Sequence, residues 1–376
     1  MKILISVNAF KGAISSVNAS QLIAGELQKL MPAQTTVCPV SDGGDGFLEV
    51  LQTKFPGSTL QTTISAPWQN AGFTTSFGYI PHNNSFVIES AKIFGLTQIP
   101  TAERHHLQLT SAGLGELLLK LQNEYAPDFP AATKILIGLG GSGINDFGIG
   151  AASKFGLELR DEDDRLLPPL PLNFTKIRKI VLPQAKCKFP VELVFDVESD
   201  LTGPQGTTQV FAPQKGASTK DCELLEAGAE NILSILKRDH NLDFSDRKIG
   251  ASGGVSLGLS LCCETHNILA KDFILNTLGL RDMIAECDVV ITGEGRLDTQ
   301  SFMNKAPGII IDEAKKRNKK IVLVCGEFDP VIRPKTMGMR EFELKNYFPS
   351  IGESIKNTSK GLTLAAKDIS SFLICE

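Results

Sequence analysis

The 376-residue sequence has no excess of positive charge, no CxxC pair and no long apolar run. Its formal net charge of -4 provides no attractive field for nucleic acid, so we expect no such partner. No apolar segment approaches the length needed to cross a bilayer, so we expect no membrane partner either. The eight cysteines are scattered, mostly in apolar runs where a reduced thiol is the default. These absences predict a cytoplasmic protein.

Two common signatures of nucleotide-dependent enzymes are also missing. The sequence contains no GxxxxGK[ST] string, which excludes a P-loop enzyme, and it lacks the loops of protein kinases. Hydrophobic residues make up 42% and charged residues 21%, which are ordinary values for a globular protein. The length is sufficient for two domains with a buried core.

Strand and helix patterns alternate at both ends of the chain, with a mixed texture between them. The apolar run Lys2–Val7 predicts a first strand rather than a signal peptide, because polar residues follow it at once. Between about 60 and 89, β-branched and aromatic runs broken by proline and glycine predict hairpins. We therefore expect an α/β protein with an open, flavodoxin- or Rossmann-like, discontinuous domain and an inserted mixed α/β domain. The first is predicted over residues 1–62 and 284–376, and the second over 63–283.

A strand pattern at 289–292 runs directly into a turn that contains Glu294, Arg296 and Asp298. The glycines of this turn allow the backbone to bend sharply and to approach a ligand closely. In open α/β sheets, ligands lie just beyond the carboxyl ends of the strands. The turn is therefore a candidate site, although a helix-capping turn with solvated charges remains an alternative for this motif alone.

A glycine-rich string follows the strand pattern at 134–138 and precedes a helix that we expect to start at about Asn145. Unpaired amides and the positive end of the helix dipole would hold a phosphate there. The residues assigned to this role are Gly140, Gly141, Ser142 and Gly143. The string also matches GxGxxG, so an NAD-dependent oxidoreductase is an alternative. The acids at 161–164 disfavour it because they lie in a proline-bounded loop rather than at a strand end. A tight turn without a ligand is the third interpretation.

Carboxylates at predicted strand ends are accompanied by cations on glycine turns. The acids are Asp42, Asp45, Asp196, Glu294 and Asp298, and the cations are Lys11, Lys215 and Arg296. Mg²⁺ requires carboxylate oxygens, phosphates require cations and amides, and an acceptor hydroxyl requires a positioned carboxylate. This balance suits a phosphoryl donor bound with Mg²⁺, although either lysine taken alone would more often be solvated.

Motifs along nearly the whole chain resemble those of the bacterial glycerate kinase family of class I. The matching strings lie at 10–12, 42–46, 138–146, 196–197, 201–204, 211–216, 250–254, 292–298 and 305–307. The resemblance implies ATP- and Mg²⁺-dependent phosphorylation of D-glycerate, with 2-phosphoglycerate favoured over 3-phosphoglycerate as the product. It also implies two α/β domains with the active site in the cleft between them. We expect a monomer or a homodimer.

On this resemblance, Asp196 is expected to orient or deprotonate the acceptor hydroxyl, with Lys11 and Asp42 as further catalytic residues. Arg296 is the first choice for the carboxylate of glycerate, because a planar guanidinium pairs a carboxylate at two points. Lys215 is the second choice.

The metal is assigned to Asp42 and Asp298, directly or through bound water, and Glu294 is assigned to the nucleotide side. Two positions depart from the family pattern. Asn8-Ala9 stands where an acid and serine are usual, and Asn304 stands where a glycine is usual. We expect Asn8 to orient the substrate in an active enzyme, because an amide can accept and donate hydrogen bonds. A catalytically impaired glycerate-binding sensor is the alternative.

Overall fold

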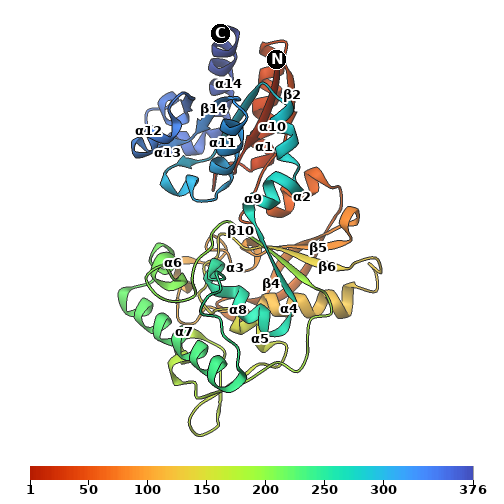
Figure 1. Ribbon diagram of the computed structural model, residues 1–376, viewed down its shortest axis with the longest axis vertical. Coiled ribbons are helices and arrows are strands. Elements are labelled where there is room, and N and C mark those ends of the chain that lie inside the picture. Colours follow the sequence, from red (N-terminus) through yellow and green to blue (C-terminus); the bar gives the residue numbers. More distant parts are fainter. Residues whose placement is uncertain (376) are drawn as a thin grey trace. The chain divides into compact units, whose positions relative to one another are not determined.

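The computed structural model describes residues 1–375 and confirms the α/β class (Figure 1). Its internal contacts divide the chain into two compact units. Unit 1 consists of Met1–Pro56 and Leu269–Glu376, and unit 2 of Gly57–Ile268. The domain boundaries inferred from the sequence lie after residue 62 and before residue 284, and they remain a prediction. Within residues 1–375, no helix combines the length and apolar character that crossing a membrane requires.

Unit 1 is built on a five-stranded sheet in which every neighbouring pair is parallel. Its strands are β1 (Lys2–Val7), β2 (Gln34–Val37), β12 (Val289–Gly293), β14 (Lys320–Cys325) and β16 (Arg340–Glu343). Their spatial order is β16-β14-β12-β1-β2. The chain moves from β1 to one side to form β2, and the later strands follow on the other side. The direction of winding therefore reverses between β1 and β12.

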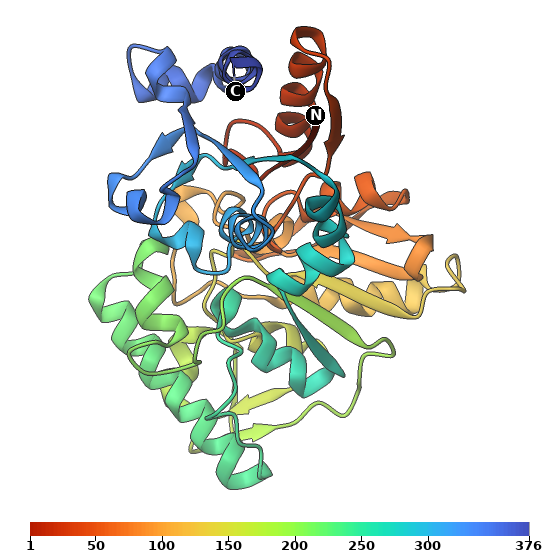
Figure 2. The ribbon, with the colours of Figure 1, turned by 45° about the horizontal axis from the view of Figure 1, so that its top comes forward.

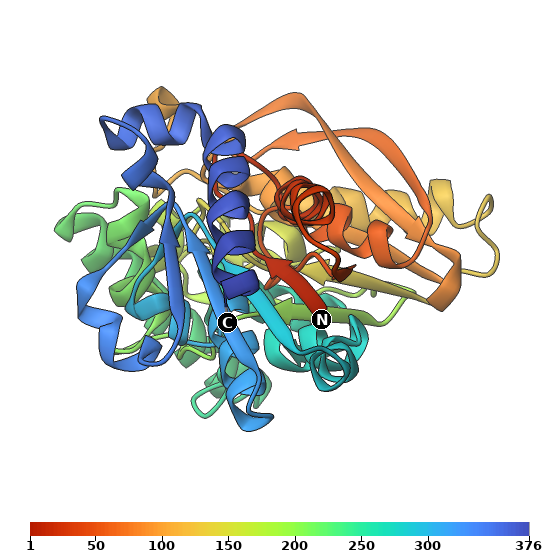
Figure 3. The same cartoon turned by 90° about the horizontal axis from the view of Figure 1, so that it is seen from above.

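Helices contact both faces of this sheet, which explains why its central strands are continuous apolar runs. The helices of unit 1 are α1 (Ser16–Leu30), α2 (Phe47–Lys54), α9 (Ala270–Asp272), α10 (Leu280–Glu286), α11 (Ala306–Lys316), α12 (Arg333–Thr336), α13 (Ile351–Lys356) and α14 (Thr358–Cys375). Figure 3 shows α14 beside α1, and both contribute to one core with Ile5, Ile291 and Val322. A short parallel pair, β13 (Arg296–Leu297) and β15 (Glu327–Phe328), follows the main strands.

Unit 2 contains a mixed six-stranded sheet. Its strands are β3 (Ser58–Ala66), β4 (Gln69–Ile80), β5 (Ser85–Glu89), β6 (Lys134–Gly138), β10 (Val191–Phe195) and β11 (Thr265–Leu269). They lie in the order β11-β10-β6-β5-β4-β3. The pairs β3–β4 and β4–β5 are antiparallel, which confirms the hairpins predicted between 60 and 89, while β5, β6 and β10 are parallel.

A smaller antiparallel sheet and several helices complete unit 2. The sheet consists of β7 (Glu158–Arg160), β8 (Leu166–Leu167) and β9 (Lys179–Val181). The helices are α3 (Ala91–Phe94), α4 (Ala112–Lys120), α5 (Ile149–Ser153), α6 (Thr207–Lys215), α7 (Thr219–His240) and α8 (Ala251–Cys262). The long helix α7, green in Figure 2, begins with a capping box in which the Ser218 hydroxyl accepts from the amide of Asp221.

Close backbone packing joins α8 to the turn before α5. The amide of Gly258 donates to Phe147 O at 2.9 Å. A Cβ atom added at Gly258 would overlap the carbonyl oxygen of Gly148. The glycine-rich apolar segment therefore allows a helix to approach the backbone of the loop that follows the 138–146 string.

We predict that Gly258→Ala destabilises the protein by about 1–3 kcal/mol, the usual cost of overpacking. Gly25→Ala in α1 is the matched control, since no atom of the described residues lies within 4 Å of an added Cβ. Alanine is the better helix former, so the control should gain up to about 1 kcal/mol. Thermal unfolding of the three proteins provides the measurement. Equal melting temperatures for both variants would contradict the assigned packing.

Candidate functional site

Two buried polar side chains lie at the point in unit 1 where the winding of the sheet reverses. Asn8 directly follows β1 and Glu294 directly follows β12, and they are 6% and 8% exposed. The backbone N–H of Asn8 donates to Gly293 O at 2.8 Å, which holds the two strand ends together. In doubly wound sheets this reversal point is the usual place for a ligand.

Asn8 is hydrogen-bonded to an acid that the sequence also singles out. Its Nδ2 donates to Asp42 Oδ2 at 3.5 Å, and its Oδ1 accepts from the amide of Ala9 at 2.9 Å. An acid in place of Asn8 would set a second carboxylate against Asp42, and like charges at that distance disfavour ionisation. The neutral amide therefore orients Asp42 without opposing its charge.

Glu294 is a buried carboxyl group with an unpaired oxygen. Burial raises its pKa, and Asp42 adds to this effect, whereas contact with Ser301 and the charges of Lys305 and Lys11 oppose it. Within the described part of the chain, Glu294 Oε1 has no hydrogen-bond partner. A buried carboxylate in this condition is a candidate ligand for a cation.

The two predicted cations of unit 1 are both accessible. Lys11 is exposed in the turn that follows the buried Phe10. The side chain of Arg296 is 63% exposed, and its Nε lies 3.9 Å from Asp298 Oδ2. Arg296 therefore retains most of its donors for a ligand, because an ion pair of that length is weak.

Asp298 caps a short 3₁₀ helix, Thr299–Phe302. Its Oδ1 accepts from the amides of Gln300 at 2.8 Å and Ser301 at 3.3 Å. The capping interpretation that the sequence left open thus applies to Asp298. Its role as a metal ligand stays a prediction, and it would have to use Oδ2.

The second departure from the family pattern has a backbone explanation. Asn304 has a φ of 62°, in the left-handed region that glycine adopts most readily. Asparagine is the side chain that tolerates this region best after glycine. The substitution therefore preserves the path of the loop before Lys305.

Mg²⁺ is compatible with the acids of unit 1. Among residues 1–375, no cluster of three or more histidines, cysteines or acids is arranged to hold a metal ion. Mg²⁺ in phosphoryl-transfer enzymes is commonly bound by one or two carboxylates, with phosphates and water completing its shell. Asp42 and Glu294, with its unpaired oxygen, are the candidates for such carboxylates.

A second group of predicted residues lies at one edge of the large sheet of unit 2. Asp196 directly follows β10, and the glycine-rich string follows β6. The two strands are parallel, and the amide of Leu139 donates to Val194 O at 2.7 Å. The half-buried Asp196 and the string from Gly140 to Gly143 therefore share the carboxyl edge of this sheet.

The prediction that a helix starts at about Asn145 was wrong, because α5 begins at Ile149 and has only five residues. The buried Asp146 carboxylate accepts from the amides of Gly148 at 3.1 Å and Gly150 at 3.2 Å. It also accepts from the amide and hydroxyl of Ser111 at 2.6 and 2.7 Å. Burial raises the pKa of Asp146, and these hydrogen bonds oppose the rise. Asp146 thus occupies two amides at the start of α5, and the assignment of a phosphate to residues 140–143 stays a prediction.

Lys215 was expected on a glycine turn, and it directly precedes Gly216, whose φ is 103°. Lys215 is the last residue of α6 and is only 8% exposed, so it is not the solvated lysine that its residue type alone would suggest. Its Nζ donates to Ser142 Oγ at 3.0 Å, Ile144 O at 2.8 Å and Asn145 Oδ1 at 3.1 Å. Burial lowers the pKa of Lys215 to about 7, although the charge of Asp146 opposes this effect. The ammonium group of Lys215 therefore contacts the glycine-rich string and not the solvent.

Sequence reasoning missed two residues of this group and one neighbour. Asn145 and Asp146 were inside the matching string, so the string itself was the available signal. His106 carried no comparable signal, being the second of two adjacent histidines in an irregular segment. It is buried beside Gly216, and burial lowers its pKa.

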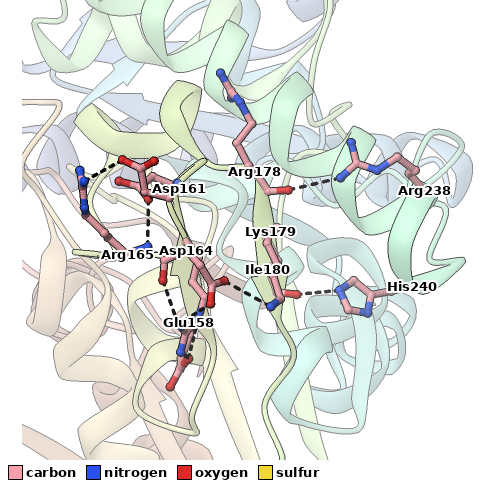
Figure 4. Close-up of polar contacts among 11 residues, drawn as sticks. Glu158, Asp161, Asp164, Arg165, Arg178, Lys179, Ile180, Arg238 and His240 are labelled. Carbon is pink, nitrogen blue, oxygen red and sulfur yellow. Dashed lines mark hydrogen bonds and ion pairs between the residues drawn. The ribbon is translucent and has the colours of Figure 1, made fainter.

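Asp161, Asp163 and Asp164 make local polar contacts in and beside the small sheet, and two of them, Asp163 and Asp164, form ion pairs (Figure 4). Asp164 pairs with Arg160 and Lys179, each at 3.3 Å. Asp161 Oδ1 accepts from the amide of Arg165 at 2.9 Å in the β7–β8 turn. These acids stabilise a hairpin, so they do not supply the ribose ligand that an NAD-binding site needs at a strand end.

Comparisons with known proteins agree with the motifs. Residues 3–374 match the model of the glycerate kinase family. A glycerate kinase from Haemophilus influenzae is 30% identical over 331 residues, covering 87% of this chain and 86% of the relative. A glycerate 2-kinase from Escherichia coli is 29% identical, with 87% and 85% covered. A crystal structure assigned as glycerate kinase 2 from Salmonella typhimurium LT2 superposes with a TM-score of 0.76 at 26% identity, covering 100% of this chain and 98% of its own.

Replacing Glu294 should raise the stability of the protein and weaken its binding of the metal. Because the pKa of Glu294 is raised in the folded state, this group lowers the free energy of unfolding as pH rises above the ordinary pKa of glutamate. The loss of stability is complete once pH exceeds the raised pKa. Glu294→Gln should therefore raise the melting temperature at pH 7.5, and this gain should disappear at low pH, where both states are protonated. Stabilisation by ATP with Mg²⁺ should decrease in the same variant.

The matched control is Glu286→Gln, which replaces an exposed glutamate of the same unit. It should change neither the melting temperature nor the effect of Mg²⁺. A loss of stability in Glu294→Gln at pH 7.5 would show that the carboxylate is held by a structural partner instead of awaiting a cation.

Proposed function

The chain is a kinase of the glycerate kinase family, and we propose that it transfers the terminal phosphoryl group of ATP to D-glycerate in a Mg²⁺-dependent reaction. The family membership inferred from the motifs is thereby confirmed. The substrate proposal is supported by relatives from three bacteria that are named glycerate kinases or glycerate 2-kinase.

One observation carries the chemistry of this proposal. A buried acid with an unpaired oxygen, Glu294, follows β12 at the reversal point of a parallel sheet, and the charges of Asp42 and Lys11 both act on it. Paired acids and a nearby lysine match the needs of a metal-bound polyphosphate, which requires negative ligands for the metal and a positive group for the phosphates.

Asp42 and Glu294 would hold Mg²⁺, with Asn8 orienting Asp42 through the hydrogen bond from its Nδ2. Asp298 is the weaker candidate for this role because one of its oxygens caps a helix. Bound Mg²⁺ supplies neutralisation of phosphate charge. Lys11 and the string from Gly140 to Gly143 would contact the phosphates.

The transfer itself requires a positioned hydroxyl. Asp196 would orient the hydroxyl of glycerate and take its proton, while the hydroxyl oxygen bonds to phosphorus and the bond to the leaving ADP oxygen breaks. The 2-hydroxyl is the favoured acceptor, which gives 2-phosphoglycerate. A cytoplasmic enzyme acting as a monomer or homodimer is part of the same proposal.

Arg296 is the preferred ligand for the carboxylate of glycerate. Its guanidinium is largely exposed and makes only a long ion pair with Asp298. Lys215, the second choice, already donates to three protein oxygens. An ammonium group has three hydrogens, so Lys215 has no donor left for direct contact.

The proposal predicts that the purified protein releases ADP from ATP and Mg²⁺ only when D-glycerate is present. A phosphorus spectrum of the product should show the monoester at the 2-position. ADP release without glycerate would contradict the assigned substrate. Glycerate binding without turnover would instead indicate the sensor, and thermal protection by NAD(H) but not by ATP with Mg²⁺ would indicate the oxidoreductase.

Arg296→Lys should weaken glycerate binding by about 1–3 kcal/mol, because the charge remains but two-point pairing with the carboxylate is lost. Binding of ATP should change little. Arg333→Lys is a close control, since Arg333 is 69% exposed and its ion pair with Glu341 is 4.0 Å long. Steady-state KM values for both substrates provide the measurement. A shift confined to the KM of ATP would place Arg296 on the nucleotide side.

A further inference from the structure

Three segments of unit 2 converge beside the glycine-rich string. They are the string itself, the end of α6 at Lys215, and the turn at 250–254 that begins α8. Lys215 Nζ donates to Ile144 O at 2.8 Å. From the other segment, a Cβ added at Gly253 would overlap the same Ile144 O and lie 3.1 Å from Asn145 Cα. Ile144 and Asn145 are therefore held between the lysine and the turn.

The contacts of Lys215 fix which way the Asn145 amide points. Asn145 Oδ1 accepts from Lys215 Nζ, because the reverse orientation would set two groups of donors against each other. Nδ2 is then the donor on the side of the amide away from Lys215. Asn145 is 1% exposed, and across the part of the chain that the structure describes, Nδ2 has no hydrogen-bond acceptor. A buried donor without an acceptor is costly to keep.

Ser142 is held in a similar way. Its Oγ accepts from Lys215 Nζ at 3.0 Å, and the residue is 6% exposed. A hydroxyl that accepts a hydrogen bond keeps its own hydrogen to donate elsewhere. Lys215 therefore presents two donors from the string, the Asn145 amide and the Ser142 hydroxyl.

The turn at 250–254 adds an unusual residue to the same region. Ser252 has φ 57° and ψ 39°, and Gly253 and Gly254 continue in the left-handed region. A serine in this conformation is strained, and such strain is retained mostly where function requires it. Considering residues 1–375 alone, the buried Ser252 Oγ has no hydrogen-bond partner.

We propose that Asn145 Nδ2, with the hydroxyls of Ser142 and Ser252, binds an oxyanion of a substrate, and that Lys215 positions Asn145 and Ser142. An oxyanion supplies the acceptors that these donors lack, and a hydrogen bond to an anion is stronger than one to water. The anion is a carboxylate or a phosphate. This inference rests on the proposed function for the identity of its two sources, glycerate and ATP.

The decisive variant is Asn145→Asp. Its carboxylate keeps an acceptor for Lys215, and the new charge pair with Lys215 offsets repulsion from the adjacent Asp146 carboxylate, so the protein should remain folded. It replaces the Nδ2 donor with a negative oxygen, so oxyanion binding should weaken by about 100-fold, as expected for loss of a charged hydrogen bond. A merely structural role for Asn145 would leave binding unchanged.

The matched control is Asn231→Asp, in the same unit. Asn231 Nδ2 donates to Phe174 O at 2.8 Å and to Ile177 O at 3.0 Å. Its replacement should lower the melting temperature and leave binding unchanged. The opposite pattern in the two variants distinguishes a ligand contact from a contact that holds the fold.

Calorimetric titrations with D-glycerate, with a non-hydrolysable ATP analogue and with inorganic phosphate identify the source of the anion. Weaker binding of glycerate alone assigns the pocket to the carboxylate, and weaker binding of the analogue and phosphate assigns it to the phosphates. Unchanged affinity for all three probes in Asn145→Asp overturns the inference. A wild type that binds a probe but never releases ADP contradicts the proposed function alone.

The positioning role of Lys215 is tested by combining Lys215→Met with Asn145→Asp. If Lys215 acts through Asn145, the two losses of affinity are strongly non-additive. Additive losses would show that Lys215 contacts the ligand itself, and they would overturn its assignment as a positioning residue.

Discussion

The pairing of β1 with β12 is the contact on which unit 1 depends. It joins Lys2–Val7 to Val289–Gly293 in parallel register, and it is closed at both ends by further hydrogen bonds. Lys2 N donates to Asp288 Oδ2 at 2.7 Å at one end, and Asn8 N donates to Gly293 O at the other. Without this pair the winding would have no reversal point, and the acids after β12 would not meet those after β2.

The two units contain buried polar groups of opposite character. In unit 1, Glu294 is a buried acid with an unpaired oxygen, which a cation could pair. In unit 2, Asn145 is held in place by Lys215 and has a buried N–H donor without an acceptor, which an anion could supply. In both cases the unpaired atom is buried, so a ligand would relieve a cost that the fold otherwise carries. The reaction proposed above involves ligands of both kinds, a metal cation and the anionic groups of ATP and glycerate.

Local patterns in the sequence were sufficient for the fold class and for the strands at 2–7, 134–138 and 289–292. Each of these depends on periodicity or on a short motif, which a single segment contains in full. The helix start at Asn145 was misjudged because the Asp146 carboxylate takes the nearby amides and is itself held by Ser111, a residue in a distant part of the sequence. The burial of Lys215 could not be predicted for the same reason, since it depends on a string about seventy residues earlier.

The discontinuity of unit 1 also has a consequence for the order in which the nascent chain can fold. Lys2 and Asp288 are separated by 286 positions, so β1 is synthesised long before its central partner. Unit 2 is continuous and can close during that interval, whereas β1 can pair at first only with β2. Until β12 emerges, one side of β1 is an unprotected apolar edge, the kind of surface that chaperones recognise and that aggregates form on. The last third of the polypeptide therefore shields the first strand that the ribosome makes.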